Sequence, residues 1–433
     1  MKFALIGQDI PMLLPTLLAD LLFAGNEGAD TAVYENNPAM QGVLQGYMDA
    51  IYQKRGLGGR ALVSEDLPQV LEEADCVIYA GDCMPASRFR MDRDALAGTS
   101  EEDPGLSDQA RVNGGLGGLM HALRGGNKVL DLCEEMTYAC PDALVMNLAQ
   151  PMGRICAVFA DAGFRCYGLG PTPLRGANGL EGLCHALHRK PATVTADIAG
   201  LPGFAFLLAL RDAATGADLL PAAEEVARKG DLGRLARRWL DWYGALPMGK
   251  VTDHAEFLPA QPDFIPEAEP AFGESVEQRK ERILHMNTIA SKGADSREGM
   301  MAQLVLLSKA PAQRPVQLAL ALLRGTDLRM AAVTRRNRGV LPQLENHAII
   351  EAELTLRAGE DVSPARRVPE ALADTLRAVD ETNRLVARAA AGDRGALREA
   401  IETDPALDGL DRLYLQDVAD KLIELHRDVL PRL

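Results

Sequence analysis

Gly7, Gln8 and Asp9 stand where an apolar run ends and a segment with leucines at helical spacing begins. A junction of this kind can bring a phosphate group close to the N-terminus of a helix, and a dinucleotide site uses several glycines for that approach. This loop has one glycine before Pro11, and Asp9 places a negative charge where the phosphate is expected. Gly7 and Gln8 are therefore candidate cofactor contacts in a loop that does not match the dinucleotide motif.

Glu35 ends the next strand-like run. An acid at the end of a second strand can accept hydrogen bonds from the ribose of adenosine. It can equally cap the turn that leads into Asn36, Asn37 and Pro38, and the sequence does not separate the two roles. Glu35 is the third candidate cofactor contact.

Two further stretches carry glycines and amides that suit a bound ligand. Asn113 opens the stretch NGGLGGLMHALR, whose glycine pairs let a ligand lie against a helix start and cost helix stability if nothing uses them. Asn147 and Gln150 follow a strand-like run, and their amides can fix sugar hydroxyls or a nicotinamide amide. We take Asn147 as a cofactor contact, and Asn113 and Gln150 as substrate contacts.

Alternating strand-like and helix-like segments in the first 170 residues must position these side chains. The alternation predicts an α/β fold with a Rossmann-like, doubly wound parallel sheet, in which ligands bind beyond the carboxyl ends of the strands. Gly7, Glu35, Gly81 and Asn147 all fall at such ends, so Gly81 is also a candidate cofactor contact. The strand-like runs are 2–7, 31–35, 61–63, 76–80 and 143–148, and the helix-like segments are 12–23, 39–54, 67–73, 115–136 and 152–162.

The pattern changes near residue 171. We expect a dinucleotide-binding domain at 1–170 and an α+β domain at 171–433 for substrate binding and oligomerisation, packed on the first without a clean linker. In this second part, strand-like runs at 193–198, 329–334 and 348–356 alternate with helix-like segments at 222–243, 277–289, 366–391, 395–403 and 410–429.

Composition argues against several classes of function. The 433 residues carry 46 Lys and Arg against 61 Asp and Glu, and the resulting net charge of −15 repels nucleic-acid phosphates. No apolar run reaches the roughly 18–20 residues of a membrane span. The 7 cysteines are odd in number and form no CxxC pair, which favours buried free thiols in a reducing compartment. We expect a soluble, cytoplasmic protein with no nucleic-acid or membrane partner.

A series of motifs runs through nearly the whole chain in a fixed order: AVYE, EEADCVIYAGDC, NGGLGGLMHALR, CPDALVMNLAQPMG, YGLGPTP, WYGALPMGKVTDHAEFLP and TRRNRGVLPQLENHAIIEAEL. In this order they resemble glycoside hydrolase family 4, the NAD-dependent glycosidases of the lactate/malate dehydrogenase superfamily. The resemblance implies a fold of that type, NAD as cofactor, a small-molecule sugar or glycoside as substrate, and a homo-oligomer.

The family's mechanism is an exception to the usual pair of catalytic carboxylates. NAD takes a hydride from sugar carbon 3, a tyrosine removes the proton on carbon 2, and the aglycone leaves by elimination before water adds and the hydride returns. A divalent metal held by a Cys and a His polarises the oxygens on carbons 2 and 3. These features are what the resemblance implies for this chain.

The chain departs from the family at several of these positions. Gly170 stands where the family has the metal-binding Cys, and Gly203 stands where it has the metal-binding His. The resemblance therefore predicts that the usual metal site is absent. Gln150 replaces the second Asn of an Asn-x-x-Asn-Pro motif, and Phe257 falls at the position of the tyrosine, with a one-residue slip left open.

Loss of a metal without replacement should cost on the order of a thousandfold or more in rate, because a metal that polarises a carbonyl supplies several kcal/mol. Asp253 and His254 are the candidate catalytic replacements in the same loop. His254 could act as a general base near neutral pH. A solvated Asp-His turn is the competing interpretation.

Arg88 and Asn337 complete the candidate substrate contacts. Arg88 lies in a charged stretch after the fourth strand-like run, and the family has a comparable stretch near its pocket; a solvated loop is the alternative. Asn337 lies where the family carries an Asn-x-Gly loop.

Three functions stay open on this evidence. The first is a glycosidase of the family 4 type that lacks the usual metal site. The second is a non-catalytic relative that binds a sugar or nucleotide and pairs with an active paralogue. The third is a plain NAD-dependent dehydrogenase that acts on a hydroxy compound.

Overall fold

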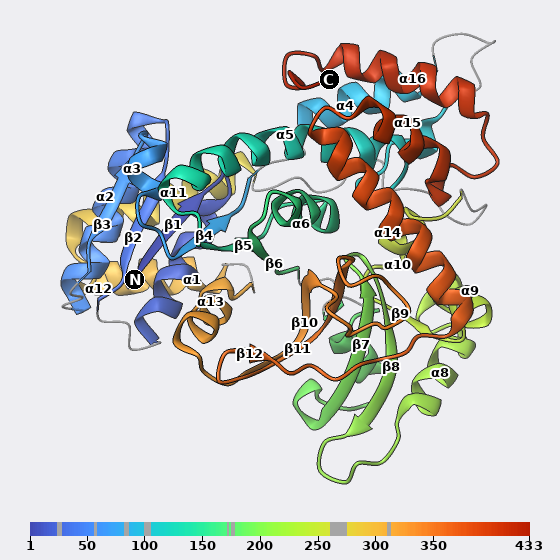
Figure 1. Ribbon diagram of the computed structural model, residues 1–433. Coiled ribbons are helices and arrows are strands. Elements are labelled where there is room, and N and C mark those ends of the chain that lie inside the picture. The colour runs from blue at the N-terminus through green and yellow to red at the C-terminus, as the bar shows by residue number, and fades with distance from the viewer. Residues whose placement is uncertain are drawn as a thin grey trace.

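A mixed β-sheet runs through the chain (Figure 1). The computed structural model describes residues 1–23, 28–55, 59–81, 86–98, 105–170, 173–174, 178–259, 275–309 and 313–433. Within these residues the strand order is β3-β2-β1-β4-β5-β6-β10-β11-β7-β8-β9, and β12 pairs with β11. The strands are β1 (Lys2–Ile6), β2 (Asp30–Tyr34), β3 (Ala61–Ser64), β4 (Cys76–Tyr79), β5 (Leu144–Asn147), β6 (Arg165–Gly168), β7 (Val194–Leu201), β8 (Phe204–Asp212), β9 (Leu246–Met248), β10 (Leu328–Arg336), β11 (Ile349–Arg357) and β12 (Glu360–Asp361).

Strands β1 to β6 pair in parallel. Leu5 of β1, for example, lies opposite Val33 of β2 and Ile78 of β4. Parallel strands are covered by helices on both faces, which is why these runs are almost wholly apolar. The predicted Rossmann-like, doubly wound sheet is confirmed.

Antiparallel pairing begins where Gly168 of β6 lies opposite Thr334 of β10. Strands β10, β11, β7, β8 and β9 then follow in antiparallel order, as expected for the α+β second half. The sheet passes from one half to the other without a break, and the division at residue 170 stays a prediction.

Helices from both halves of the chain cover the parallel strands. One face is covered by α1, α2, α11, α12 and α13, and the other by α3, α5, α6, α14, α15 and α16, so the two halves share their cores. The described helices are α1 (Ile10–Phe23), α2 (Pro38–Arg55), α3 (Leu67–Leu71), α4 (Ala86–Leu96), α5 (Gly115–Ala139), α6 (Met152–Asp161), α7 (Leu180–Ala186), α8 (Leu220–Lys229), α9 (Gly233–Tyr243), α10 (Val251–Ala255), α11 (Val276–Lys292), α12 (Arg297–Ser308), α13 (Pro315–Arg324), α14 (Glu370–Ala390), α15 (Arg394–Thr403) and α16 (Arg412–Leu425).

Some local expectations need correction. Residues 222–243 fall into two helices, α8 and α9, because the chain turns at Gly230 with a φ of 92°. Residues 86–96 and 165–168, for which the pattern predicted no element, form α4 and β6. The charged stretch that contains Arg88 is therefore helical, not a loop.

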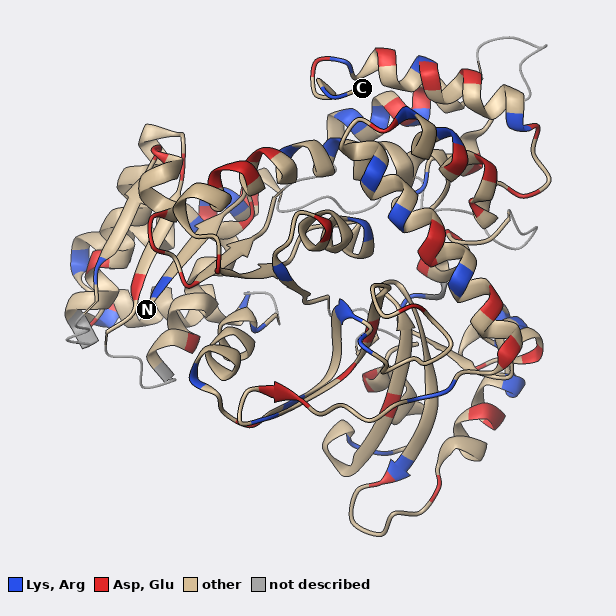
Figure 2. Ribbon diagram, in the orientation of Figure 1, with Lys and Arg blue, Asp and Glu red and all other residues tan. Residues whose placement is uncertain are grey.

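Charged side chains of both signs alternate along surface helices such as α14 and α16 (Figure 2). None of the helices in the described ranges is long and apolar enough to cross a membrane. The cysteines in these ranges are buried free thiols, as predicted, and Cys83 lies outside them: Cys76, Cys133, Cys140, Cys156, Cys166 and Cys184.

A buried group of charges ties α4 and α5 to the C-terminal end of the chain. The Arg124 guanidinium on α5 donates to the two oxygens of Asp92 on α4, at 3.1 and 2.7 Å, and Nε2 of His426 lies 2.6 Å from Asp92 Oδ1. All three side chains are buried. Burial alone would raise the pKa of Asp92, but hydrogen bonds from His426 and Arg124 outweigh burial and lower it. Asp92 is therefore a charged anchor between these helices.

Asp92→Ala is expected to lower the free energy of unfolding by about 3–5 kcal/mol, because it leaves Arg124 buried without its carboxylate. Urea unfolding followed by circular dichroism measures the loss. Asp428→Ala is the matched control, since Asp428 binds Arg88 at the surface and its removal should cost far less. Equal losses for the two variants would contradict the anchoring role of Asp92.

Candidate functional site

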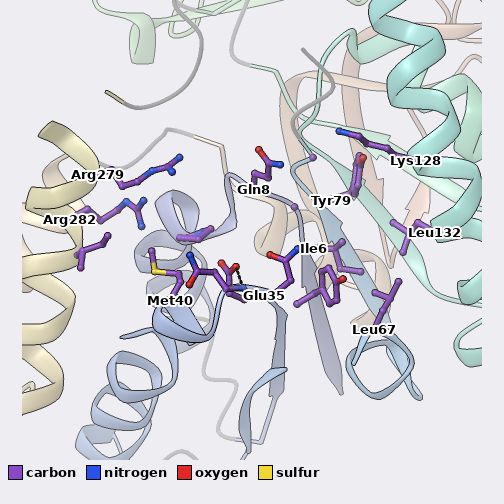
Figure 3. Close-up of a pocket in the computed structure, with 17 residues that line it drawn as sticks. Ile6, Gln8, Glu35, Met40, Leu67, Tyr79, Lys128, Leu132, Arg279 and Arg282 are labelled. Atoms are coloured by element: carbon purple, nitrogen blue, oxygen red, sulfur yellow. Dashed lines mark hydrogen bonds between the residues drawn. The ribbon is translucent and has the colours of Figure 1, made fainter. Parts of the chain in front are cut away.

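A cavity of about 810 Å³ opens beyond the carboxyl ends of β1, β2 and β4. Ligands bind at this edge in doubly wound sheets. Gly7, Gln8, Glu35 and Gly81 line the cavity, so the structure brings together all the predicted cofactor contacts except Asn147 (Figure 3). The other lining residues are Ile6, Pro11, Tyr34, Asn36, Asn37, Met40, Leu67, Tyr79, Lys128, Leu132, Arg279, Arg282 and Ile283.

Gly7 is required at the end of β1 by its backbone geometry. Its φ is 130°, and a Cβ placed on it would lie 2.2 Å from the carbonyl carbon of Ala80. Any side chain here would push β1 and the end of β4 apart. Gly7 therefore keeps the two strand ends close at the floor of the cavity.

Glu35 combines the two roles that the sequence left open. Its Oε1 accepts a hydrogen bond from the backbone N–H of Asn37 at 2.9 Å, so it caps the turn after β2. The same residue lines the cavity, where Figure 3 shows it between Met40 and Ile6. A carboxylate that uses one oxygen for the turn still has a second oxygen for a ligand.

Sequence analysis missed the cationic residues of this cavity. Lys128 comes from α5, and Arg279 and Arg282 come from α11. Figure 3 shows the two arginines on one side of the cavity and Lys128 across from them, beside Tyr79. Helix α11 reaches the cavity only because it packs against α2, and no local pattern signals that contact.

Asn147 and Gln150 use their amides within the loop after β5. The Nδ2 of Asn147 donates to the carbonyl of Ala149 at 3.1 Å, and its Oδ1 accepts from the N–H of Ala149 at 3.0 Å. Asn147 is fully buried and does not line the cavity. Asn147 therefore holds the loop after β5, and the structure does not place it as the predicted cofactor contact. Gln150 Oε1 accepts from the N–H of Met152, so this predicted substrate contact caps the start of α6.

Glu256 is a candidate site residue that sequence analysis did not select. Its Oε2 accepts hydrogen bonds from the backbone N–H of Asn113 at 2.7 Å and from Asn113 Nδ2 at 2.8 Å. Burial and the nearby charge of Asp253 raise the pKa of Glu256 to about 7, while the hydrogen bonds from Asn113 lower it. Asn113, a predicted substrate contact, thus holds a carboxyl group that titrates near neutrality.

Arg111 fixes the loop that carries Glu256. This fully buried side chain donates from Nη1 to the carbonyls of Glu256 and Leu258, at 2.9 and 2.7 Å. Gly114 allows the close approach, since a Cβ on it would lie 2.0 Å from the carbonyl oxygen of Glu256. The sequence suggested that this glycine before α5 leaves room for a ligand. In the structure it leaves room for the loop of Glu256.

His254 is not placed to act as the predicted general base. It is 0% exposed, and the centroid of its ring lies 5.0 Å from the ring centroid of Phe204 and 5.1 Å from that of Phe206. Burial lowers its pKa to about 4, although the hydrogen bond of Nε2 with the carbonyl of Met248 raises it. His254 therefore belongs to the core, and this position fits neither the predicted catalytic role nor the alternative of a solvated turn. Asp253 lies nearer the surface, 3.9 Å from Lys250, and acts on the pKa of Glu256.

Arg88 is tied to the C-terminal end of the chain. Its guanidinium donates to Asp428 and lies 3.3 Å from Nδ1 of His426. These contacts give Arg88 a structural role, and its role as a substrate contact stays a prediction.

Asn337 is fully buried in its own loop. Its Nδ2 donates to the carbonyls of Leu341, Leu344 and Glu345, and its Oδ1 accepts from the N–H of Leu341. The amide therefore holds this loop, where the sequence predicted a substrate contact.

Two family models match the chain and decide its classification. The family 4 glycosyl hydrolase model matches residues 15–165, and the family 4 glycosyl hydrolase C-terminal domain model matches residues 198–407. The chain belongs to glycoside hydrolase family 4. The resemblance stated from the motifs is confirmed.

Solved structures of family 4 enzymes share the fold. A 6-phospho-α-glucosidase from gut microorganisms, in complex with NAD and Mn²⁺, has a TM-score of 0.72 at 15% identity over 99% of this chain and 98% of that chain. A 6-phospho-β-glucosidase from Thermotoga maritima, with NAD and glucose-6-phosphate, has a TM-score of 0.71 at 16% identity over 99% of both chains. An α-glucosidase from Erwinia rhapontici is 30% identical over 132 residues, which span 30% of this chain and 28% of that protein.

Gly170 and Gly203, which the motif resemblance predicts at the positions of the family's metal ligands, offer no side-chain donor. Gly203 lies against the loop of Glu256, since a Cβ on it would be 3.5 Å from the ring of Phe257. Within the ranges that the structure describes, no group of three or more His, Cys, Asp or Glu could hold a metal ion. Residues 171–172 and 175–177 lie outside those ranges, and the missing metal site stays a prediction.

Glu351 is a buried acid beside Gly203 that sequence analysis also missed. It lies on β11 opposite Thr334 of β10 and is 2% exposed. Burial raises its pKa to about 8, against the lowering effect of a hydrogen bond from the Gly203 N–H. Glu351 is therefore mostly protonated near neutral pH, with the N–H of Gly203 beside it.

Glu256→Gln is expected to change how stability depends on pH. In the folded protein the pKa of Glu256 is about 7, above its ordinary 4.5, so the unfolded chain ionises first as pH rises. The wild type should lose unfolding free energy relative to Glu256→Gln between about pH 4.5 and 7, and the difference should stay constant above that window. Urea unfolding at a series of pH values measures it. Glu360→Gln, at an exposed position, is the control, and a flat difference for Glu256→Gln would contradict the shift.

Proposed function

We propose that the protein is an NAD-dependent glycosidase that cleaves its substrate by transient oxidation and elimination, without the Cys and His metal ligands of its family. The observation that carries the proposal is the contact between the loop of Glu256 and Gly203. This contact joins the loop that resembles the family's base-bearing loop to the position of the family's metal-binding His. Glu256 lies one residue before the expected tyrosine position, at Phe257.

The cavity at the ends of β1, β2 and β4 supports NAD as the cofactor. Gly7 leaves backbone room that a Cβ would fill, and Glu35 brings a carboxylate suited to a ribose hydroxyl. NAD bound there would supply a hydride acceptor that takes a hydride from a sugar carbon and later returns it. Two solved family 4 relatives carry NAD in their structures, which supports the same assignment.

Glu256 is suited to move the proton on the carbon beside the oxidised one. A carboxyl group with a pKa of about 7 can both accept and return a proton near neutral pH. Asn113 orients it with two hydrogen bonds to one oxygen, and Arg111 holds the loop by binding its carbonyls. The oxidised sugar makes the neighbouring C–H acidic, so one positioned carboxylate is enough to start elimination.

Gly170 and Gly203 do not fit a cation held by Cys and His, and we assign no step to a metal. We propose glucosides and their 6-phosphates as the substrate class, because the proteins similar to this chain include glucosidases and 6-phospho-glucosidases. A non-catalytic sugar- or nucleotide-binding subunit is the second candidate, favoured by the same two glycines.

Glu256→Gln should lower kcat by about 10²- to 10⁴-fold, because the proton-abstracting group is lost. The assay uses aryl α- and β-glucosides and their 6-phosphates with NAD, in the presence and absence of EDTA. The wild type should turn over without net NADH accumulation and keep its rate in EDTA. NAD binding, measured by calorimetry, should be unchanged in the variant.

Other outcomes separate the remaining functions. NAD binding without turnover on the whole panel would favour the non-catalytic subunit, and net NADH formation would favour a plain dehydrogenase. Turnover that stops in EDTA would contradict the assignment of a metal-free reaction.

Asp253→Asn should move the rising limb of the pH–rate profile to lower pH. Glu256 must be ionised to act as a base, and the charge of Asp253 raises the pKa of Glu256. Removing that charge should lower the pKa of the base, so half-maximal rate should be reached below the wild-type value. An unchanged limb would argue that another group accepts the proton. Lys280→Gln, an exposed cation on α11, is the control.

A further inference from the structure

The start of α1 lacks the backbone donors that hold a diphosphate in related folds. The N–H of Asp9 donates to the carbonyl of Ala80 at 3.2 Å, and the N–H of Ile10 donates to the carbonyl of Gly7 at 3.3 Å. Pro11 has no N–H. In dinucleotide folds the amides at this helix start point at the pyrophosphate. Here two of these amides are used within the chain, and a third does not exist.

Positive charge reaches the same cavity from other elements. Lys128 on α5 and Arg279 and Arg282 on α11 line it, and among the described residues of the lining the one carboxylate is Glu35. This local excess of positive charge occurs in a protein with a net charge of −15. Guanidinium groups bind phosphate oxygens in a bidentate manner, and an ammonium group adds a point charge.

Helix α11 is held firmly enough to serve as one wall of the cavity. Ser275 caps its first turn in a reciprocal pair of hydrogen bonds with Gln278. Met286 and Ile289 are buried in the core that α1 and α2 share. Arg279 and Arg282 are three residues apart on this anchored helix, so both present their side chains on the same side, as Figure 3 shows.

We propose that Lys128, Arg279 and Arg282 bind the phosphates of a nucleoside diphosphate in this cavity, the ADP-ribose half of NAD in the proposed function on which this inference rests. These side chains would bind the phosphates in place of the backbone amides that bind them in the glycine-rich loop of a dinucleotide fold. Binding should then depend on the phosphates of the ligand more than on its adenosine. It should also weaken as ionic strength rises.

The experiment is calorimetry of the full-length protein with NAD, ADP-ribose, ADP, adenosine and NADP. Arg279→Gln and Arg282→Gln should each weaken NAD and ADP-ribose binding by about tenfold or more, because each removes a charge-assisted hydrogen bond to phosphate. Adenosine binding should change less than twofold. Lys280→Gln, the neighbouring exposed cation on α11, is the matched control and should bind NAD like the wild type. Thermal unfolding checks each variant, and the exposed Arg279 provides the test should the buried Arg282 variant not fold.

The outcomes distinguish this inference from the proposed function. If the wild type binds NAD and the arginine variants bind it equally well, the phosphate site is overturned and the proposed function stands. If the wild type binds ADP but not NAD, with the same arginine dependence, the phosphate site is upheld and the proposed function fails. If only NADP binding depends on the arginines, they serve a 2′-phosphate and the diphosphate assignment is overturned. If no phosphorylated ligand binds, both are overturned.

Discussion

Close contact between Gly168 and Thr334 holds the two halves of the sheet together. Thr334 of β10 pairs with Gly168 of β6, and a Cβ on Gly168 would lie 2.5 Å from Sδ of Met152 and 2.9 Å from Cβ of Thr334. A side chain there would push α6 or β10 away from the parallel strands. Beyond β10 the sheet continues with β11 and β7, which carry Glu351 and lead to the turn at Gly203. The joint between the parallel and the antiparallel strands therefore depends on a position with no side chain.

The shared core has a functional consequence, because distant parts of the chain build each site. The cavity takes its glycines from the ends of β1 and β4 but its arginines from α11, and Glu256 is held by Asn113 and Arg111 from the segment before α5. The C-terminal end of the chain is in turn held to α4 and α5 through Asp92, Arg124 and His426. A ligand that contacts the arginines and the strand ends would thus bridge the two halves and should stabilise both against unfolding.

The sequence predicts the parts of this molecule that depend on local pattern. Apolar runs bounded by Gly7, Glu35 and Gly81 identify strands and their ends, and the cavity lies where those ends meet. It does not predict roles that depend on contacts between distant segments. His254 and Glu256 are two residues apart in one loop, yet one is packed between phenylalanines and the other is held by Asn113, because the direction of each side chain is set by the sheet beneath it. Arg88 and Arg279 are similar cases. Arg88 binds Asp428, and Arg279 lines a cavity whose glycines come from the first strands, so both depend on segments hundreds of residues away that residue spacing cannot reveal.

The backbone at Gly203 restricts which residues this position can hold. Its φ is 79°, in the left-handed region that residues with a Cβ rarely adopt, and its N–H donates to buried Glu351. A histidine at this position would carry about 1–2 kcal/mol of backbone strain and would meet the ring of Phe257. A histidine here would therefore require a change in the turn between β7 and β8, whose backbone conformation suits glycine. The backbone conformation at Gly203 thus constrains this position together with its neighbours, the buried carboxyl of Glu351 and the loop of Glu256.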